Sequence, residues 1–193
     1  MINRFSQAPP ETVYVSFTAE IQPATAEALI SVLGQQASNG VKHVHLMLSS
    51  PGGAVMSGFT IYNAIRGMPF RLTTHNIGNV DSICNVVFLA GEERLVCKHS
   101  TFMFHGVGIQ TTGPMRLDLR QLSESIGQVK ADDQRVANLF AERTDMSARD
   151  VLRLFTKART ENADFALAHG FATAIREVEI PEGAPIISFA FNR

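Results

Sequence analysis

The sequence lacks several features that would point to particular classes of protein. Its 193 residues include no tryptophan and only two cysteines, Cys84 and Cys97. Two cysteines are too few for a disulfide framework or for a metal site of their own. The formal net charge is -1, and the chain contains neither a basic block nor basic residues interleaved with aromatic ones. We therefore expect no bound metal and no nucleic-acid partner.

Long apolar runs are also missing. No stretch approaches the length needed to cross a bilayer, and residues 1–7 lack the apolar region of a signal peptide. Hydrophobic residues make up 45% and charged residues 18%, an ordinary balance for a globular protein of one domain. We expect a cytoplasmic protein that is not associated with a membrane. A single domain would span residues 1–193, with a loose N-terminal tail over residues 1–11.

Hydrophobic periodicity predicts alternating strands and helices. The predicted strands are residues 12–17, 42–48 and 70–77, and the predicted helices are residues 24–36, 54–66 and 83–90. A strand that is followed by a helix and another strand normally forms a right-handed crossover between parallel neighbours. The sequence therefore predicts an α/β fold with a mainly parallel sheet.

Three chemically suggestive groups each follow the end of a predicted strand. They are the Gly52-Gly53 turn, Ser82 at the start of an apolar helix, and His105 after residues 101–104. In parallel sheets, ligands bind outside the carboxyl ends of the strands, so these groups should lie on the same side. A serine hydroxyl needs a base such as histidine to become a nucleophile. The N–H group of Ile83 and the glycine turn could bind a developing oxyanion.

Each of these features also has an ordinary structural explanation. Serine is a common N-cap, Gly-Gly is a common turn, and a histidine at a strand end often bonds to backbone. Taken alone, Ser82 would be interpreted as an N-cap. The joint occurrence of the three groups in this order favours an acyl-transfer site.

The sequence also predicts an unusually long helix over residues 114–143. About thirty residues is far above the average helix length. A helix this long on a small domain must protrude or pack on another subunit. Further helices are expected over residues 148–156, with Ser147 as the N-cap, and over residues 162–169, and a late strand over residues 186–191.

Between residues 12 and 175 the chain resembles the proteolytic subunit of the Clp protease, most specifically between residues 46 and 105. The motifs that carry this resemblance are Leu48-Ser49-Ser50-Pro51-Gly52-Gly53, Ile61-Tyr62, Gly78 four residues before Ser82, Leu89-Ala90-Gly91, and Phe102-Met103-Phe104-His105. The resemblance implies a ClpP/crotonase-type spiral of βαβ units in which residues 114–143 form a protruding handle helix.

The resemblance also implies an activity, a site and partners. The activity is that of a serine peptidase that cleaves peptides or unfolded chains without a cofactor. Ser82 would be the nucleophile and His105 the base, and Gly53 and Ile83 would supply the oxyanion-hole N–H groups. The family forms rings, two of which meet through the handle, and works with an ATPase partner. Residues 1–11 have little counterpart to the axial loops that face this ATPase.

The third member of the triad departs from the family pattern. Alignment on the last helix and Gly170 places Ala158 at the position of the acid. Glu161 is the first choice for a substitute and Asp164 the second. Asn162 is a neutral alternative, because an amide can orient a histidine without stabilising its charge.

These observations leave two main hypotheses and a weaker third. The first is a Clp-like serine peptidase, and the second is a catalytically impaired structural subunit of a mixed assembly. A crotonase-type acyl-CoA enzyme is disfavoured because nothing in the sequence suggests a nucleotide site. Elsewhere, His43 and His45 could share a face as metal ligands do, but without a third ligand they are better interpreted as partly exposed strand histidines. Asp132-Asp133 has no partner at metal spacing either.

Overall fold

A computed structural model describes residues 11–109, 113 and 116–189 of the chain. The N-terminal tail expected over residues 1–11 therefore lies outside the described residues, except for Glu11. The elements in chain order are β1 (Thr12–Phe17), α1 (Pro23–Ser38), β2 (His43–Ser50), α2 (Val55–Arg66), β3 (Arg71–Asp81), α3 (Cys84–Phe88), β4 (Glu93–Val96), β5 (Thr101–Phe104), α4 (Leu119–Arg143), α5 (Ala148–Lys157), β6 (Arg159–Asn162), α6 (Ala163–Ala168), β7 (Ala174–Ile175) and β8 (Ile186–Ser188).

The strands form one sheet that is almost entirely parallel. Its order is β6-β5-β3-β2-β1-β8, and β4 joins both β3 and β7 beside this path. Among the described strands, only β5 and β6 run antiparallel. The predicted mixed α/β fold with a mainly parallel sheet is confirmed.

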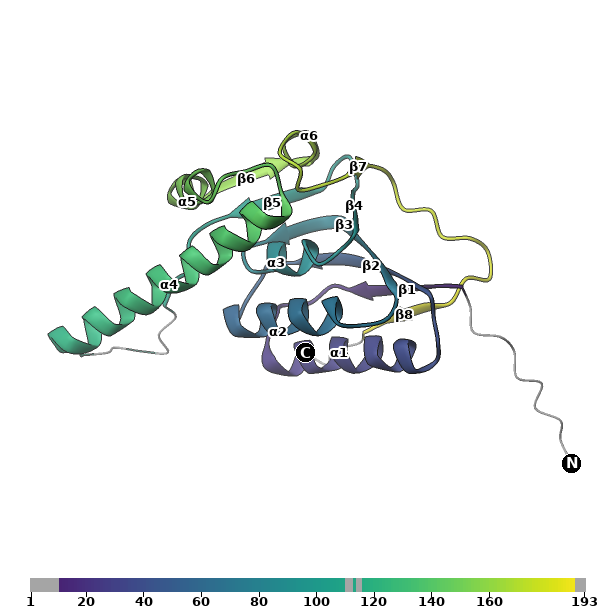
Figure 1. Cartoon of the computed structure of the whole chain (residues 1–193), viewed down its shortest axis with the longest axis horizontal. Helices are drawn as coiled ribbons and strands as arrows, with labels where there is room; N and C mark the ends of the chain where they lie inside the picture. Colours follow the sequence, from purple (N-terminus) through teal and green to yellow (C-terminus); the bar gives the residue numbers. More distant parts are fainter. Residues whose placement is uncertain (1–10, 110–112, 114–115, 190–193) are drawn as a thin grey trace, which may run out of the picture.

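Apolar helix faces and apolar strands bury the core between them. Helices α1 and α2 pack against each other below the sheet in Figure 1. The short helix α3 is buried along its whole length. A cluster of phenylalanine rings joins β5 to the C-terminal helices, with ring centroids 5.0 Å apart for Phe104–Phe171 and for Phe140–Phe171. This cluster anchors the strand that ends just before His105.

Cys84 belongs to this core as a small apolar side chain. It is fully buried, and burial raises the pKa of its thiol to about 12. A thiol that stays protonated at neutral pH is a poor nucleophile. Cys84 therefore does not compete with Ser82, two residues away, as a reactive group.

Helix α4 protrudes from the body, as expected of a handle, but it is shorter at its start than the sequence predicted (Figure 1). The helix begins at Leu119 rather than at residue 114. The reason is Asp118, whose side chain accepts a hydrogen bond from the Gln121 N–H, while the Gln121 side chain accepts one from the Asp118 N–H. This reciprocal capping box makes Asp118 the N-cap, so the helix begins at the next residue.

The two halves of α4 have different surroundings. Toward its C-terminal end, Val136, Leu139 and Phe140 are buried against the body. Toward its N-terminal end, Leu119, Leu122 and Ile126 are exposed, with Leu119 at 84%. The apolar stripe of the helix thus continues past the part of α4 that packs against the body.

Other boundaries differ from the predicted ones for identifiable reasons. Strand β3 continues to Asp81, because after pairing with β4 through Thr73–Asn76 it pairs with β5 from Asn79 onward. Strand β6 was not expected, because Arg-Thr-Glu-Asn has no apolar alternation. Helix α6 begins one residue late, since Asn162 is its N-cap and accepts from the Phe165 N–H.

Three histidines form hydrogen bonds across the middle of the sheet. The His43 Nε2 lies 2.9 Å from the Thr73 hydroxyl, and the His45 Nε2 lies 3.0 Å from the His75 Nδ1. The His75 Nε2 donates to the Arg176 carbonyl at 2.9 Å, so its Nδ1 must accept the proton of His45. His43 and His45 are both partly exposed, which agrees with the interpretation of them as strand histidines.

Burial keeps this histidine chain neutral. Desolvation, with the neighbouring imidazole of His75 acting in the same direction, lowers the pKa of His45 from 6.5 to about 4. Desolvation also lowers the pKa of His75 and of His43. In the unfolded chain these side chains would bind protons near pH 6.5, whereas in the folded protein they resist protonation until lower pH.

We predict that the protein loses stability as the pH falls from 6.5 to about 4. The unfolded state binds more protons than the folded state in this range, so acid favours unfolding. Thermal unfolding measured at intervals across the range should show a falling midpoint. His45→Gln, whose amide can still donate to His75, should flatten the slope because it removes a group whose pKa burial lowers. Equal slopes for the wild type and His45→Gln would contradict the prediction.

Candidate active site

Ser82 lies in a tight turn between β3 and α3. Its φ is +55°, and Ala158 is the only other non-glycine residue with positive φ among those that the structure describes. Left-handed backbone is unfavourable for a residue with a side chain, and such residues concentrate at functional sites. The Ser82 N–H donates to the Met103 carbonyl on β5 at 2.9 Å. The turn is thereby attached to the strand that leads to His105.

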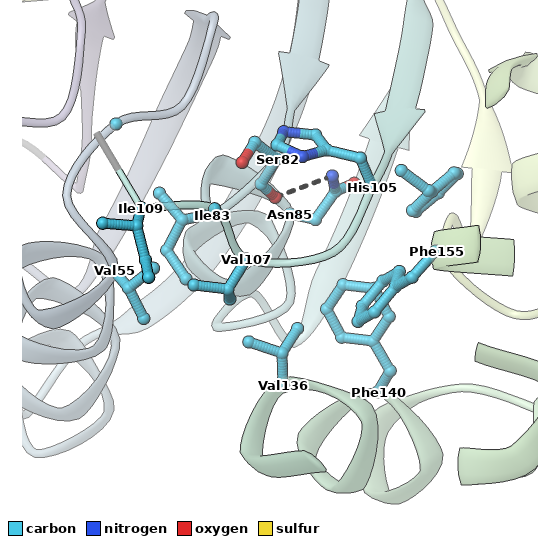
Figure 2. Close-up of a pocket in the computed structure, with 13 residues that line it drawn as sticks. Val55, Ser82, Ile83, Asn85, His105, Val107, Ile109, Val136, Phe140 and Phe155 are labelled. Atoms are coloured by element: carbon cyan, nitrogen blue, oxygen red, sulfur yellow. Dashed lines mark hydrogen bonds between the residues drawn. The ribbon is translucent and has the colours of Figure 1, made fainter. Parts of the chain in front are cut away.

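Asn85 makes a second attachment between the same two segments. Its side-chain Nδ2 donates to the Ser82 carbonyl at 2.9 Å and to the Met103 carbonyl at 3.0 Å. Because both partners are carbonyls, the amide can have only this orientation. The Asn85 Oδ1 is buried and accepts no hydrogen bond from the described residues. Asn85 thus attaches the Ser82 turn to β5, and Figure 2 shows its side chain beside Ser82.

The glycine turn lies directly against Ser82. A Cβ on Gly52 would come within 2.7 Å of the Ser82 Cβ, and a Cβ on Gly53 would overlap the Ile21 carbonyl. Residues 52–54 and Ile21 are joined by backbone hydrogen bonds, from Ile21 N–H to the Gly52 carbonyl and from Ala54 N–H to the Ile21 carbonyl. Only glycine fits this close approach.

Two backbone donors near Ser82 are unused. Within the described part of the chain, neither the Gly53 N–H nor the Ile83 N–H donates to an acceptor. Ile83 is buried, and a buried N–H without a partner is rare in native proteins. Both residues line the same pocket as Ser82. Two free donors beside a serine are what an oxyanion hole requires.

His105 directly follows β5, and its ring is held by one backbone hydrogen bond. The Nδ1 lies 2.7 Å from the Gly106 carbonyl oxygen. A carbonyl can only accept, so the Nδ1 carries the proton and the neutral ring leaves its Nε2 free to accept one. This is the tautomer that a general base toward a serine needs.

Ser82 and His105 face a common pocket of about 300 Å³. Figure 2 shows the His105 ring beside Ser82, with Phe140 and Phe155 at the far end. The other side chains that line the pocket are mainly apolar and include Val55, Ile83, Phe104, Val107, Ile109 and Val136. Among the described residues, no hydrogen bond joins the Ser82 hydroxyl to His105. Such bonds are often long in enzymes without substrate and tighten only when substrate binds.

Ala158 directly precedes β6. Strand β6 pairs with β5 so that Arg159 is opposite Phe104, the residue before His105. The methyl side chain of Ala158 neither donates nor accepts a hydrogen bond, so it cannot orient a histidine.

The proposed substitutes for the acid lie elsewhere. Glu161 is opposite Phe102, and its carboxylate pairs with the Arg159 guanidinium at 3.3 Å in a different pocket. Asn162 caps α6, and Asp164 is exposed in the first turn of that helix. In this conformation none of the three makes a hydrogen bond to His105. Because β6 is extended, Glu161 lies three positions along the strand from Ala158, and Asn162 and Asp164 lie further along the chain.

Asp133, which the sequence reasoning set aside, is the carboxylate that the structure brings to this region. Its Oδ1 accepts a hydrogen bond from the Val107 N–H at 2.6 Å. Both carboxylate oxygens would lie 3.2 Å from a Cβ placed on Gly106. A usable signal was present in the sequence: Asp133 lies in helical register with Val129, Val136 and Phe140, on the apolar stripe of α4.

The fold and the site together define an α/β protein with a serine, a histidine and free backbone donors at the carboxyl end of a parallel sheet. This architecture, with its long protruding helix, is consistent with the ClpP/crotonase fold. Comparison with known protein families matches residues 6–179 to the Clp protease family. The chain belongs to this family, whose members are serine peptidases that generally form rings and bind protein substrates. None of its helices within the described residues is long and apolar enough to span a membrane.

We predict that Asn85→Asp strongly destabilises the protein at neutral pH. A carboxylate cannot donate to the Ser82 and Met103 carbonyls and would be buried facing two acceptors, which should cost at least about 1–3 kcal/mol. Asn138→Asp makes the same chemical change at an exposed position of α4 and preserves the bond from Gln134, so it serves as the matched control. Chemical denaturation of both variants measures the difference. Equal stabilities would show that Asn85 is not the attachment described above.

Proposed function

We propose that the protein is a serine peptidase that cleaves peptides or unfolded chains through an acyl-enzyme. The observation that carries this proposal is the convergence of Ser82, His105 and the two unused N–H groups of Gly53 and Ile83 on one pocket. Membership in the Clp protease family supports the same reaction class.

The proposed reaction proceeds in two balanced halves. The Nε2 of His105 takes the Ser82 hydroxyl proton as the oxygen attacks the substrate carbonyl, and the Gly53 and Ile83 N–H groups bind the resulting oxyanion. The protonated imidazole then gives its proton to the leaving amine, and the peptide bond breaks. In the second half, His105 takes a proton from a water that attacks the Ser82 ester, and it returns this proton to the Ser82 oxygen as the ester bond breaks and the acid product leaves.

The shape of the pocket supports an apolar side chain next to the cleaved bond. Phe140, Phe155 and Val136 form the end away from Ser82, and the polar side chains lining the pocket are Ser82, Asn85 and His105. Burying an apolar side chain against these residues would help to hold the substrate carbonyl at the nucleophile.

The second candidate function is a structural subunit with little or no activity, and Ala158 is the observation that favours it. In trypsin-type proteases, replacing the aspartate that orients the histidine costs about 10⁴ in rate. A Ser–His pair without a directly bonded carboxylate would accordingly be slow. A catalytic role for Glu161 as the acid stays a prediction. The ion pair of Glu161 with Arg159 does not favour it.

We predict that a fluorophosphonate probe modifies Ser82. A serine activated by His105 should form one covalent adduct at neutral pH, which intact mass spectrometry detects, because the activated oxygen displaces fluoride from phosphorus. Ser82→Ala should give no adduct, and the exposed Ser123 provides a second control through Ser123→Ala, which should label normally. If the wild-type protein remains unlabelled after long incubation, the structural-subunit hypothesis replaces the peptidase.

We also propose that the protein self-associates into rings or another homo-oligomer through its handle. The exposed apolar residues Leu119, Leu122 and Ile126 lie on the half of α4 that this chain leaves uncovered. Helical stripes of this kind normally bury against a partner. The expectation of an ATPase partner rests on family resemblance alone.

We predict that Leu122→Lys combined with Ile126→Lys lowers the molar mass of the assembly. The charges would be placed in the apolar contact between subunits, where burying them is costly. Multi-angle light scattering at micromolar concentration measures the mass. Glu124→Lys, on the opposite and exposed side of the same helix, should leave it unchanged. A monomeric wild-type protein would refute the proposed self-association.

A further inference from the structure

One peptide group connects the handle helix to the candidate base. The carbonyl of Gly106 accepts the proton of His105 Nδ1 at 2.7 Å. The N–H at the other end of the same peptide group belongs to Val107 and donates to the Asp133 Oδ1 at 2.6 Å. Carboxylate, peptide and imidazole therefore form one continuous line of hydrogen bonds.

The direction of every proton in this line is determined. The Asp133 carboxylate can only accept from the Val107 N–H, and the Gly106 carbonyl can only accept from the His105 ring. A carboxylate that accepts from the N–H end of a peptide polarises its carbonyl, which makes the oxygen a better acceptor. Charge-assisted hydrogen bonds of this type are short and strong.

The local sequence permits this arrangement. Gly106 has no side chain, and a Cβ there would lie only 3.2 Å from both Asp133 oxygens. Asp133 lies on the half of α4 that packs against the body, three residues before the buried Val136. The position of its carboxylate is thus set by the same packing that fixes α4 on β5 and α5.

Other charged groups around His105 are committed to different partners. On β3, the Asp81 carboxylate accepts from the Asn79 amide at 2.6 Å. On β6, Arg159 and Glu161 pair with each other. On α4, Asp132 accepts from Gln128 and pairs with Arg135. Among these carboxylates, Asp133 alone is connected to His105 through a chain of hydrogen bonds.

We propose that Asp133 is a positioning residue for His105 that acts through the peptide group between Gly106 and Val107. Asp133 holds the ring in its Nδ1–H tautomer. It thereby supplies, through one intervening peptide group, the orienting role that Ala158 cannot fill. This inference deepens the proposed peptidase function and rests on it for its meaning in catalysis. The hydrogen-bonded line itself can be tested without any activity.

The test compares Asp133→Asn, Asp133→Ala and the wild-type protein. Asparagine retains an oxygen that accepts from the Val107 N–H but removes the charge, whereas alanine removes both. Magic-angle-spinning NMR of protein labelled with ¹⁵N-histidine reports the tautomer of His105 and its Nδ1–H proton shift in assemblies of any size. The His105 signals are assigned by their loss in His105→Gln.

We expect a graded response in both the spectrum and the reactivity. Asp133→Asn should keep the Nδ1–H tautomer, move the Nδ1–H proton upfield and slow fluorophosphonate labelling of Ser82 several-fold. Asp133→Ala should give a mixture of tautomers and slow labelling by about tenfold to a hundredfold, as the loss of a charge-assisted hydrogen bond implies. A merely structural role for Asp133 would not move the His105 signals in the folded asparagine variant.

A matched variant controls for other effects. Asp132→Asn removes the same charge one residue away on α4 and should keep the wild-type His105 spectrum. The proposal is overturned if Asp133→Asn has a wild-type Nδ1–H signal, or if Asp132→Asn changes it as much. These spectra distinguish the proposal from the peptidase function, because failure of wild-type labelling overturns the function and leaves the spectral test intact.

Discussion

The candidate site depends on one acceptor, the carbonyl oxygen of Met103. It takes hydrogen bonds from the Ser82 N–H and from the Asn85 side chain, and it lies on β5, two residues before His105. A single backbone atom thus sets the separation between the proposed nucleophile and the proposed base. Strand β5 is itself held by the phenylalanine cluster of the core. The packing of the C-terminal helices therefore influences the position of this carbonyl and, through it, the geometry of the site.

Around this atom, the fold maintains backbone conformations that would be unfavourable on their own. Ser82 has a positive φ, and Gly53 approaches Ile21 so closely that no side chain would fit. The strain is maintained because β3 pairs with both β4 and β5 and cannot relax at its end. The consequence is that the Ile83 N–H is left without an acceptor where a reacting carbonyl oxygen would need it.

The sequence alone was sufficient to predict the α/β fold and to predict that Gly53, Ser82 and His105 lie close together. These predictions succeeded because apolar periodicity and glycine turns are local signals, and parallel strands bring their carboxyl ends to one side. Local signals failed for β6, whose polar residues form a strand only because β5 offers an unpaired edge. They also placed the start of α4 too early, since the capping box of Asp118 and Gln121 begins the helix at Leu119.

What the sequence determined by itself was that Ala158 cannot serve as an acid, because a methyl group neither accepts a proton nor carries a charge. Which carboxylate could replace it was decided only by the tertiary structure. Nearness along the chain favoured Glu161, but an extended strand carries that residue away from the ring, and Arg159 pairs with it. Asp133 is 28 positions from His105 in sequence. It reaches the segment after His105 because α4 packs back across β5. Hydrogen bonds through one peptide group then connect its carboxylate to the His105 ring.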